Sequence, residues 1–105
     1  MTLQEIKEIE LTELEKKVVD YFNFNYKDLE SNLQDNANFV DFSDVEGIEA
    51  KVLRGVFSSL IKKGIIFYAE DCDVFYISNT GVILFFLINY PEEVEKADLS
   101  NWVEK

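Results

Sequence analysis

The sequence contains no histidine, the side chain that most often serves as a general base or zinc ligand near neutral pH. It has one cysteine, Cys72, so no disulfide can form within it. The acidic neighbours Glu70, Asp71 and Asp73 disfavour a reactive thiolate. The four glycines lack the spacing of a phosphate-binding loop. We therefore expect a protein that is not an enzyme, with no catalytic residues, no cofactor and no metal site.

Long hydrophobic runs are also missing. The longest, 82–88, has seven residues, whereas a helix that crosses a membrane needs about 20. Acidic residues at positions 5, 8 and 10 interrupt any apolar stretch of the kind that signal peptides contain. Hydrophobic residues still make up 48% of the chain, enough for a core without disulfides. We expect one soluble, cytoplasmic domain over 1–105 that does not contact a membrane.

Basic residues are scarce: 10 lysines and arginines stand against 21 acidic residues, which gives a formal net charge of −11. That balance argues against nucleic acid as a partner for most of the surface, because phosphate neutralisation drives such binding. The exception is the stretch 50–68, which has four basic residues and no acidic one, a local charge of +4. This stretch fits an ordinary solvated helix face, a face that binds a polyanion, or one that binds an acidic protein.

The periodicity of the stretch 49–63 predicts the longest amphipathic helix of the chain, ended by Gly64. One face of this helix collects its hydrophobic side chains, namely Val52, Leu53, Val56, Phe57, Leu60 and Ile61. The opposite face collects small and basic residues, namely Lys51, Arg54, Gly55, Ser58 and Lys62. These five are the candidate residues for binding a nucleic acid.

Shorter elements are expected before this helix. Residues 1–10 form an acidic lead-in with a frayed helical turn. A helix over 12–24 begins with the capping box of Thr12 and Glu15 and carries a core stripe of Leu14, Val18, Tyr21 and Phe22. A helical segment over 26–34, capped by Asn25, leads through a polar loop to a strand candidate at 39–42 and a short helical turn at 43–47.

After the long helix, 65–68 and 74–77 predict two antiparallel strands joined by an acidic turn with Glu70, Asp71 and Asp73. The run 80–88 has a helix cap at its start but the composition of a strand, and we favour the helix. Pro91 starts an acidic C-terminal helix over 91–105, with Val94, Ala97 and Trp102 turned inward.

This order of elements is that of a winged helix-turn-helix domain, in which the helix before the hairpin enters the major groove and the hairpin is the wing. The segments 11–18 (LTELEKKV) and 51–64 (KVLRGVFSSLIKKG) resemble small, mostly uncharacterised winged-helix proteins of phages and mobile elements. The resemblance implies an α+β fold with a two-stranded wing and an additional C-terminal helix. It also implies DNA binding in transcription regulation.

On this resemblance, Arg54 reads a guanine, Ser58 contacts a base or phosphate, and Lys51 and Lys62 bind phosphates, while Gly55 permits close approach. The sequence departs from the pattern at the hairpin tip, which is acidic where a DNA-binding wing usually carries lysine or arginine. It departs again at 43–47, which is shorter than the usual supporting helix.

The charge distribution supports an alternative function on the same fold. An acidic protein-interaction module would bind a basic protein through Glu70, Asp71 and Asp73, and would imitate nucleic acid against a host DNA-binding protein. Either function is compatible with a homodimer formed through 82–88, because this apolar run exceeds what one small domain readily covers.

Overall fold

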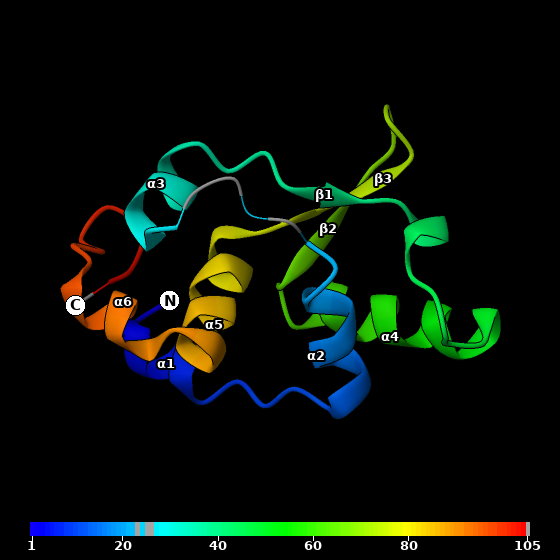
Figure 1. Cartoon of the computed structure of the whole chain (residues 1–105), viewed down its shortest axis with the longest axis horizontal. Coiled ribbons are helices and arrows are strands. Elements are labelled where there is room, and N and C mark those ends of the chain that lie inside the picture. The colour runs from blue at the N-terminus through cyan, green and yellow to red at the C-terminus, as the bar shows by residue number, and fades with distance from the viewer. Residues whose placement is uncertain (23, 25–26, 105) are drawn as a thin grey trace.

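The computed structural model describes residues 1–22, 24 and 27–104. Helices and a small sheet alternate along this part of the chain, which makes the fold α+β (Figure 1). The elements are α1 (Leu3–Lys7), α2 (Glu13–Val19), α3 (Leu29–Gln34), β1 (Phe39–Val40), the 3-10 helix η1 (Phe42–Asp44), α4 (Ala50–Lys62), β2 (Ile66–Ala69), β3 (Val74–Ile77), α5 (Asn79–Asn89) and α6 (Pro91–Lys96).

The sheet has three antiparallel strands in the order β1-β3-β2. The predicted hairpin is present as β2 and β3, and the strand candidate at 39–42 supplies β1, which pairs along the free edge of β3. The sequence predicted a two-stranded hairpin, because nothing local to 39–42 shows which strand it joins. Val40 lies 35 residues from its partner Phe75 in the sequence, and only the tertiary fold brings the two residues together.

One face of the sheet packs on α4. Val40 and Phe75 lie opposite one another on this face, and the Phe75 ring meets the Phe57 ring of α4 edge-to-face with centroids 4.5 Å apart. Ile66 and Ile77 pair at the other end of the same face and are almost completely buried. Because such aromatic and β-branched contacts bury large apolar areas, they hold α4 in a fixed position and orientation against this face of the sheet.

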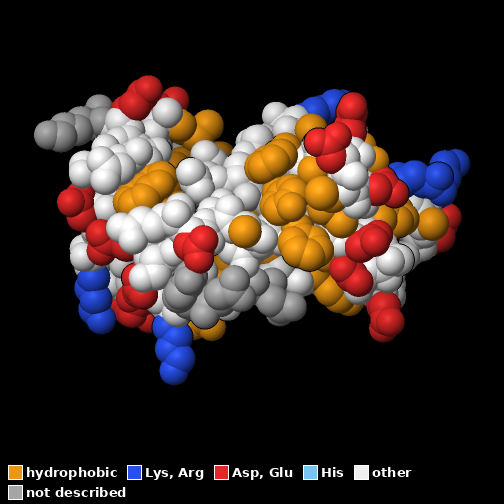
Figure 2. All heavy atoms as spheres, turned by 90° about the horizontal axis from the view of Figure 1, so that it is seen from above, with side chains coloured by type: hydrophobic (Ala, Val, Ile, Leu, Met, Phe, Trp, Pro, Cys, Tyr) orange, Lys and Arg blue, Asp and Glu red, His pale blue; other side chains and the backbone are white. Residues whose placement is uncertain are grey.

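The other face of the sheet is turned outward. The strand register places Phe39, Tyr76 and Phe67 side by side across β1, β3 and β2. Figure 2 looks down on the molecule from the side of the sheet in Figure 1 and shows hydrophobic side chains gathered on this face, with acidic side chains beside them. The sequence pattern did not single out this face.

The apolar stripe of α4 is narrower than its sequence predicts. Leu53 and Leu60 lie at its centre and are buried, as are Val56 and Phe57. Val52 and Ile61 are 42% and 41% exposed, so assigning both to the core was wrong. At about 100° per residue these two side chains lie at opposite edges of the stripe, where the flat sheet no longer covers the helix.

The helix α2 differs from its prediction in length and in rotation. It ends at Val19, although 12–24 was expected to be helical, and Leu14 is 40% exposed. Glu15 is buried in its place, beside Val18 and Val19. The carboxylate can be buried because it has charged and polar partners on α4.

The N-terminal lead-in is an ordered part of the core, so the expected frayed turn was wrong. The side chain of Thr2 accepts a hydrogen bond from the Glu5 amide, while the Glu5 carboxylate accepts one from the Thr2 amide. This capping box starts α1, which packs on α5 and buries Ile6. A bridge between Thr2 and Glu104 joins the two ends of the described chain.

Residues 80–88 form a helix, as favoured from the sequence. The Ser78 hydroxyl accepts a hydrogen bond from the Gly81 amide and caps α5. The helix has no polar face because α1, α3 and α6 surround much of it. None of the described helices combines the length and apolar character needed to cross a membrane.

The remaining helices differ in extent from their predictions. Pro91 does begin α6, but the helix ends at Lys96 instead of running to 105. Val94 is buried, and Ala97 and Trp102 are half-buried against the core. The helix α3 begins at Leu29, where Asp28 caps it, while the expected cap, Asn25, lies outside the described residues.

Two helical glycines provide a stability test of this packing. A Cβ at Gly81 would collide with the Ile65 carbonyl oxygen and lie 2.6 Å from Ile77 Cγ1, whereas a Cβ at Gly55 meets nothing within 4 Å. We expect Gly81→Ala to lower the free energy of unfolding by about 2 kcal/mol or more. We expect Gly55→Ala to raise it by about 0.5–1 kcal/mol. Urea unfolding measures both, and equal effects would contradict this packing of α5 on the sheet.

Candidate nucleic-acid interface

The five residues proposed from the sequence lie together on the solvent side of α4. Lys51, Arg54, Gly55, Ser58 and Lys62 are all exposed, and α4 contains no acidic residue. The Arg54 Nε donates a 3.4 Å hydrogen bond to the Ala50 carbonyl of its own helix. We call these five residues the basic face of α4.

The positive charges of the basic face are not neutralised by the protein itself. Among residues 1–22, 24 and 27–104, no acidic side chain forms an ion pair within 4.0 Å of Lys51, Arg54 or Lys62. Gly55 lies between these cations and has open space where a side chain would stand. The face is therefore cationic, small at its centre and accessible.

Lys63 belongs to the same basic stretch but has a different role. Its ammonium group donates to Glu15 Oε1 at 2.8 Å and to the Glu10 carbonyl at 2.8 Å, and about a third of the side chain is exposed. One of the four charges counted in 50–68 is thus used inside the molecule. Three remain for an external partner.

The partner of Lys63 is the most buried acidic side chain described. Glu15 is 2% exposed, and its carboxylate accepts hydrogen bonds from Lys63, from the Ser59 hydroxyl at 2.9 Å and from the Thr12 amide at 2.8 Å. Burial acts to raise the pKa of Glu15. The hydrogen bonds from Lys63, Thr12 and Ser59, with the charge of Lys63, outweigh it and hold the pKa below its ordinary value.

Sequence reasoning assigned Glu15 only to the capping box. A further signal was available, because Glu15 shares a helix face with Val18, Val19 and Phe22 at spacings of three, four and seven residues. An acidic residue on the core face of an amphipathic helix needs a buried cation or donor. Ser59 and Lys63, four residues apart on the long helix, are suited to that role.

The acidic residues of the alternative function lie at the tip of the β2–β3 hairpin. Glu70, Asp71 and Asp73 are exposed there, as is Cys72. Asp73 has a φ of 54° and accepts a hydrogen bond from the Tyr68 hydroxyl, which raises the pKa of that phenol. Figure 1 shows the hairpin tip well separated from α4, so the two charged groups do not share one surface.

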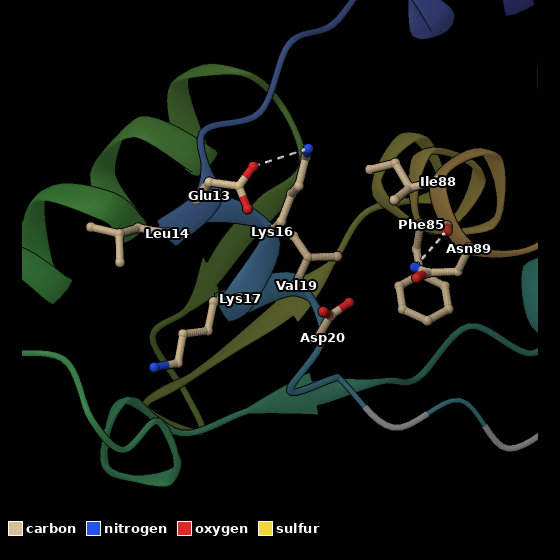
Figure 3. A pocket seen from close by; sticks show the side chains of 9 residues that line it. All are labelled: Glu13, Leu14, Lys16, Lys17, Val19, Asp20, Phe85, Ile88 and Asn89. Atoms are coloured by element: carbon tan, nitrogen blue, oxygen red, sulfur yellow. Dashed lines mark hydrogen bonds and ion pairs between the residues drawn. The ribbon is translucent and has the colours of Figure 1, made fainter.

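A groove of about 510 Å³ runs between α2 and α5 (Figure 3). On its α2 wall Glu13 and Lys16 pair with each other at 3.5 Å, and on its α5 wall the Asn89 side chain donates to the Phe85 carbonyl. Glu13, Lys16 and Asn89 thus bond within their own helices. Across the described part of the chain, no three acidic or cysteine side chains converge as metal ligands would.

The apolar run proposed for a homodimer is largely covered by its own chain. Val82, Ile83, Leu84 and Phe86 are buried in the core, while Ile88 is 43% exposed. The surface that 82–88 offers to a second copy is therefore smaller than the sequence suggested. The homodimer stays a prediction.

Comparisons with protein-family models, with curated proteins and with solved structures each find no match for this chain.

The buried carboxylate predicts a specific dependence of stability on pH. Because folding lowers the pKa of Glu15, the ionised group stabilises the fold above its ordinary pKa of 4.5, and this stabilisation is lost as the pH falls through the lowered value. We expect Glu15→Gln to cost about 2 kcal/mol at pH 7. The difference in the free energy of unfolding between Glu15→Gln and the native protein should become smaller at pH 3–4.

The matched control is Glu13→Gln, which removes the same charge from the same helix at an exposed position. It should change the free energy of unfolding by less than about 0.5 kcal/mol at either pH. Urea unfolding of the three proteins at both pH values makes the comparison. Equal stability of Glu15→Gln and the native protein at pH 7 would show that the buried network contributes nothing.

Proposed function

We propose that this chain is a small winged-helix DNA-binding protein that acts in transcription regulation and presents α4 to the major groove. The order α2, α3, β1, η1, α4, β2 and β3 supports this assignment, because the helix with the basic face directly precedes a hairpin, as in a winged-helix domain. The short η1 occupies the place of the supporting helix that precedes the recognition helix.

The observation that carries the proposal is the basic face of α4. In a protein of net charge −11, a helix with three cations outside any ion pair and no acid is suited to contact phosphate. The major groove of B-DNA is wide enough to admit one α-helix. Exposure of the whole 13-residue helix on this side is consistent with entry into that groove.

Each residue of the face has a proposed role. Arg54, which lies between Lys51 and Lys62 along the helix, donates two hydrogen bonds to O6 and N7 of a guanine. Lys51 and Lys62, about 16 Å apart along the helix by its rise per residue, bind phosphates on either side. Ser58 contacts a base edge or a phosphate. Gly55 has no side chain to project from the centre of the face, so the helix backbone approaches the bases closely.

The acidic hairpin is compatible with this orientation. Its tip lies apart from α4 in Figure 1, and charges separated by more than about 8 Å are largely screened at physiological ionic strength. In this proposal the hairpin is not a DNA contact, unlike a wing that carries lysine or arginine.

The test is binding to duplex DNA over a range of salt, from about 50 to 200 mM, by fluorescence anisotropy. We expect Lys51→Ala with Arg54→Ala to weaken binding about tenfold or more at the lower salt. The slope of log affinity against log salt should also fall by about one, because Lys51 contacts a phosphate whereas Arg54 contacts a base.

The matched control is Lys7→Ala with Lys27→Ala, which removes two exposed cations that lie outside α4. This pair should leave the salt slope unchanged although the net charge changes equally. Equal loss in both double variants would mean that binding follows overall charge, and no binding of the native protein at either salt would overturn the proposal.

A second candidate function is binding of a basic protein. The exposed Glu70, Asp71 and Asp73 at the hairpin tip favour it, since they form an anionic site on a different side of the molecule from α4. The two functions use different surfaces and do not exclude one another.

A further inference from the structure

The outer face of the sheet carries a continuous row of aromatic rings. The Tyr76 ring lies between its cross-strand neighbours, with centroids 5.8 Å from Phe39 and 5.8 Å from Phe67, and it is stacked on Phe67 at an interplanar angle of 20°. We call Phe39, Tyr76 and Phe67 the aromatic row. It crosses all three strands.

The row is exposed although the sheet does not need it for its core. Phe39 is 56% exposed and Phe67 is 51% exposed, while the opposite face already supplies Val40, Phe75 and Ile77 to the interior. Cross-strand ring pairs stabilise a sheet modestly. Packing within one chain explains why the rings of the row contact one another. It does not explain why two phenylalanines leave half of their surface exposed to water.

The segments that build this face contain no cation. Residues 28–50, which include β1, have seven acidic residues and no lysine or arginine; residues 64–95, which include β2 and β3, have six and none. The hairpin tip with Glu70 and Asp71 directly follows β2. The segments that carry the rings therefore contribute only negative charges to this face.

The negative charge of these segments limits the kind of partner that can bind the aromatic row. A single-stranded nucleic acid would stack its bases on such rings, but it also requires cations for its phosphates. A second copy of the chain would bring an identical anionic surface and be repelled. Cations are attracted both by carboxylates and by the faces of aromatic rings.

We propose that the aromatic row and the hairpin tip together bind an arginine-rich segment of a partner protein. Planar guanidinium groups stack on the rings of Phe39, Tyr76 and Phe67, and neighbouring arginines pair with the carboxylates of Glu70 and Asp71. This inference rests on the second candidate function and names the chemistry of its partner. It does not depend on DNA binding by α4.

The experiment uses the full chain and a fluorescein-labelled 12-residue peptide of alternating arginine and serine, with its lysine–serine analogue for comparison. The native protein should bind the arginine peptide more tightly than the lysine peptide, because guanidinium stacks on rings better than ammonium does. Phe39→Ser with Phe67→Ser should weaken arginine-peptide binding about fivefold or more and abolish that preference. Both positions are exposed, and thermal unfolding verifies that the variant is folded.

Charge is tested separately with a matched pair of double variants. Glu70→Gln with Asp71→Asn removes two charges beside the row, and Glu92→Gln with Glu95→Gln removes two from α6, which lies far from the hairpin in Figure 1. Only Glu70→Gln with Asp71→Asn should lower the affinity for the arginine peptide by several fold. No binding by the native protein, equal affinity for both peptides, or equal loss in both charge pairs would overturn the inference.

A failure here is distinguishable from a failure of the DNA proposal. Lys51→Ala with Arg54→Ala lies on α4 and should leave peptide affinity unchanged or slightly improved. The aromatic double variant should in turn leave the salt slope of DNA binding unchanged. Loss of both activities in either variant would show that the two surfaces are not separate.

Discussion

The buried carboxylate of Glu15 holds α2 against α4, and the exposed surface of α4 depends on it. Glu15 bonds Ser59 and Lys63 at the C-terminal end of α4 at 2.8–2.9 Å, from the first turn of α2. With that side of α4 fixed to α2 and a second side packed under the sheet, only one arc of the helix remains for solvent. The cations of the basic face occupy this arc. The contacts that fix the orientation of α4 about its own axis therefore also determine which of its residues form the candidate interface.

The molecule carries two surfaces of opposite character. The basic face of α4 offers three cations around a glycine, while the aromatic row stands in a cation-free part of the chain on the outer side of the sheet. Within dimensions of 38 × 26 × 21 Å, charges separated by more than about 8 Å act almost independently at physiological salt. On the two proposals, this acidic protein binds a polyanion with one surface and a cationic segment with another.

Features set by local pattern could be predicted from the sequence. The periodicity and end signals of α4, the hairpin, the Thr12 capping box and the start of α6 at Pro91 are short-range, and the five residues of the basic face are exposed as predicted. Features that depend on contacts between residues distant in the sequence could not be predicted. Glu15 meets Ser59 and Lys63 across 44 and 48 residues, and this contact turns Leu14 outward against its hydrophobic pattern. The outward aromatic row likewise depends on a strand register that a single sequence does not show.

The most direct measurement of the central claim is a titration of isotope-labelled protein with a duplex DNA at low salt, followed by backbone amide shifts in nuclear magnetic resonance spectra. If α4 enters the groove, the shifts concentrate on the amides of Lys51, Arg54, Gly55, Ser58 and Lys62, and those of the hairpin tip stay in place. Shifts centred on the sheet, or no shifts at all, would contradict the assignment of DNA binding to α4.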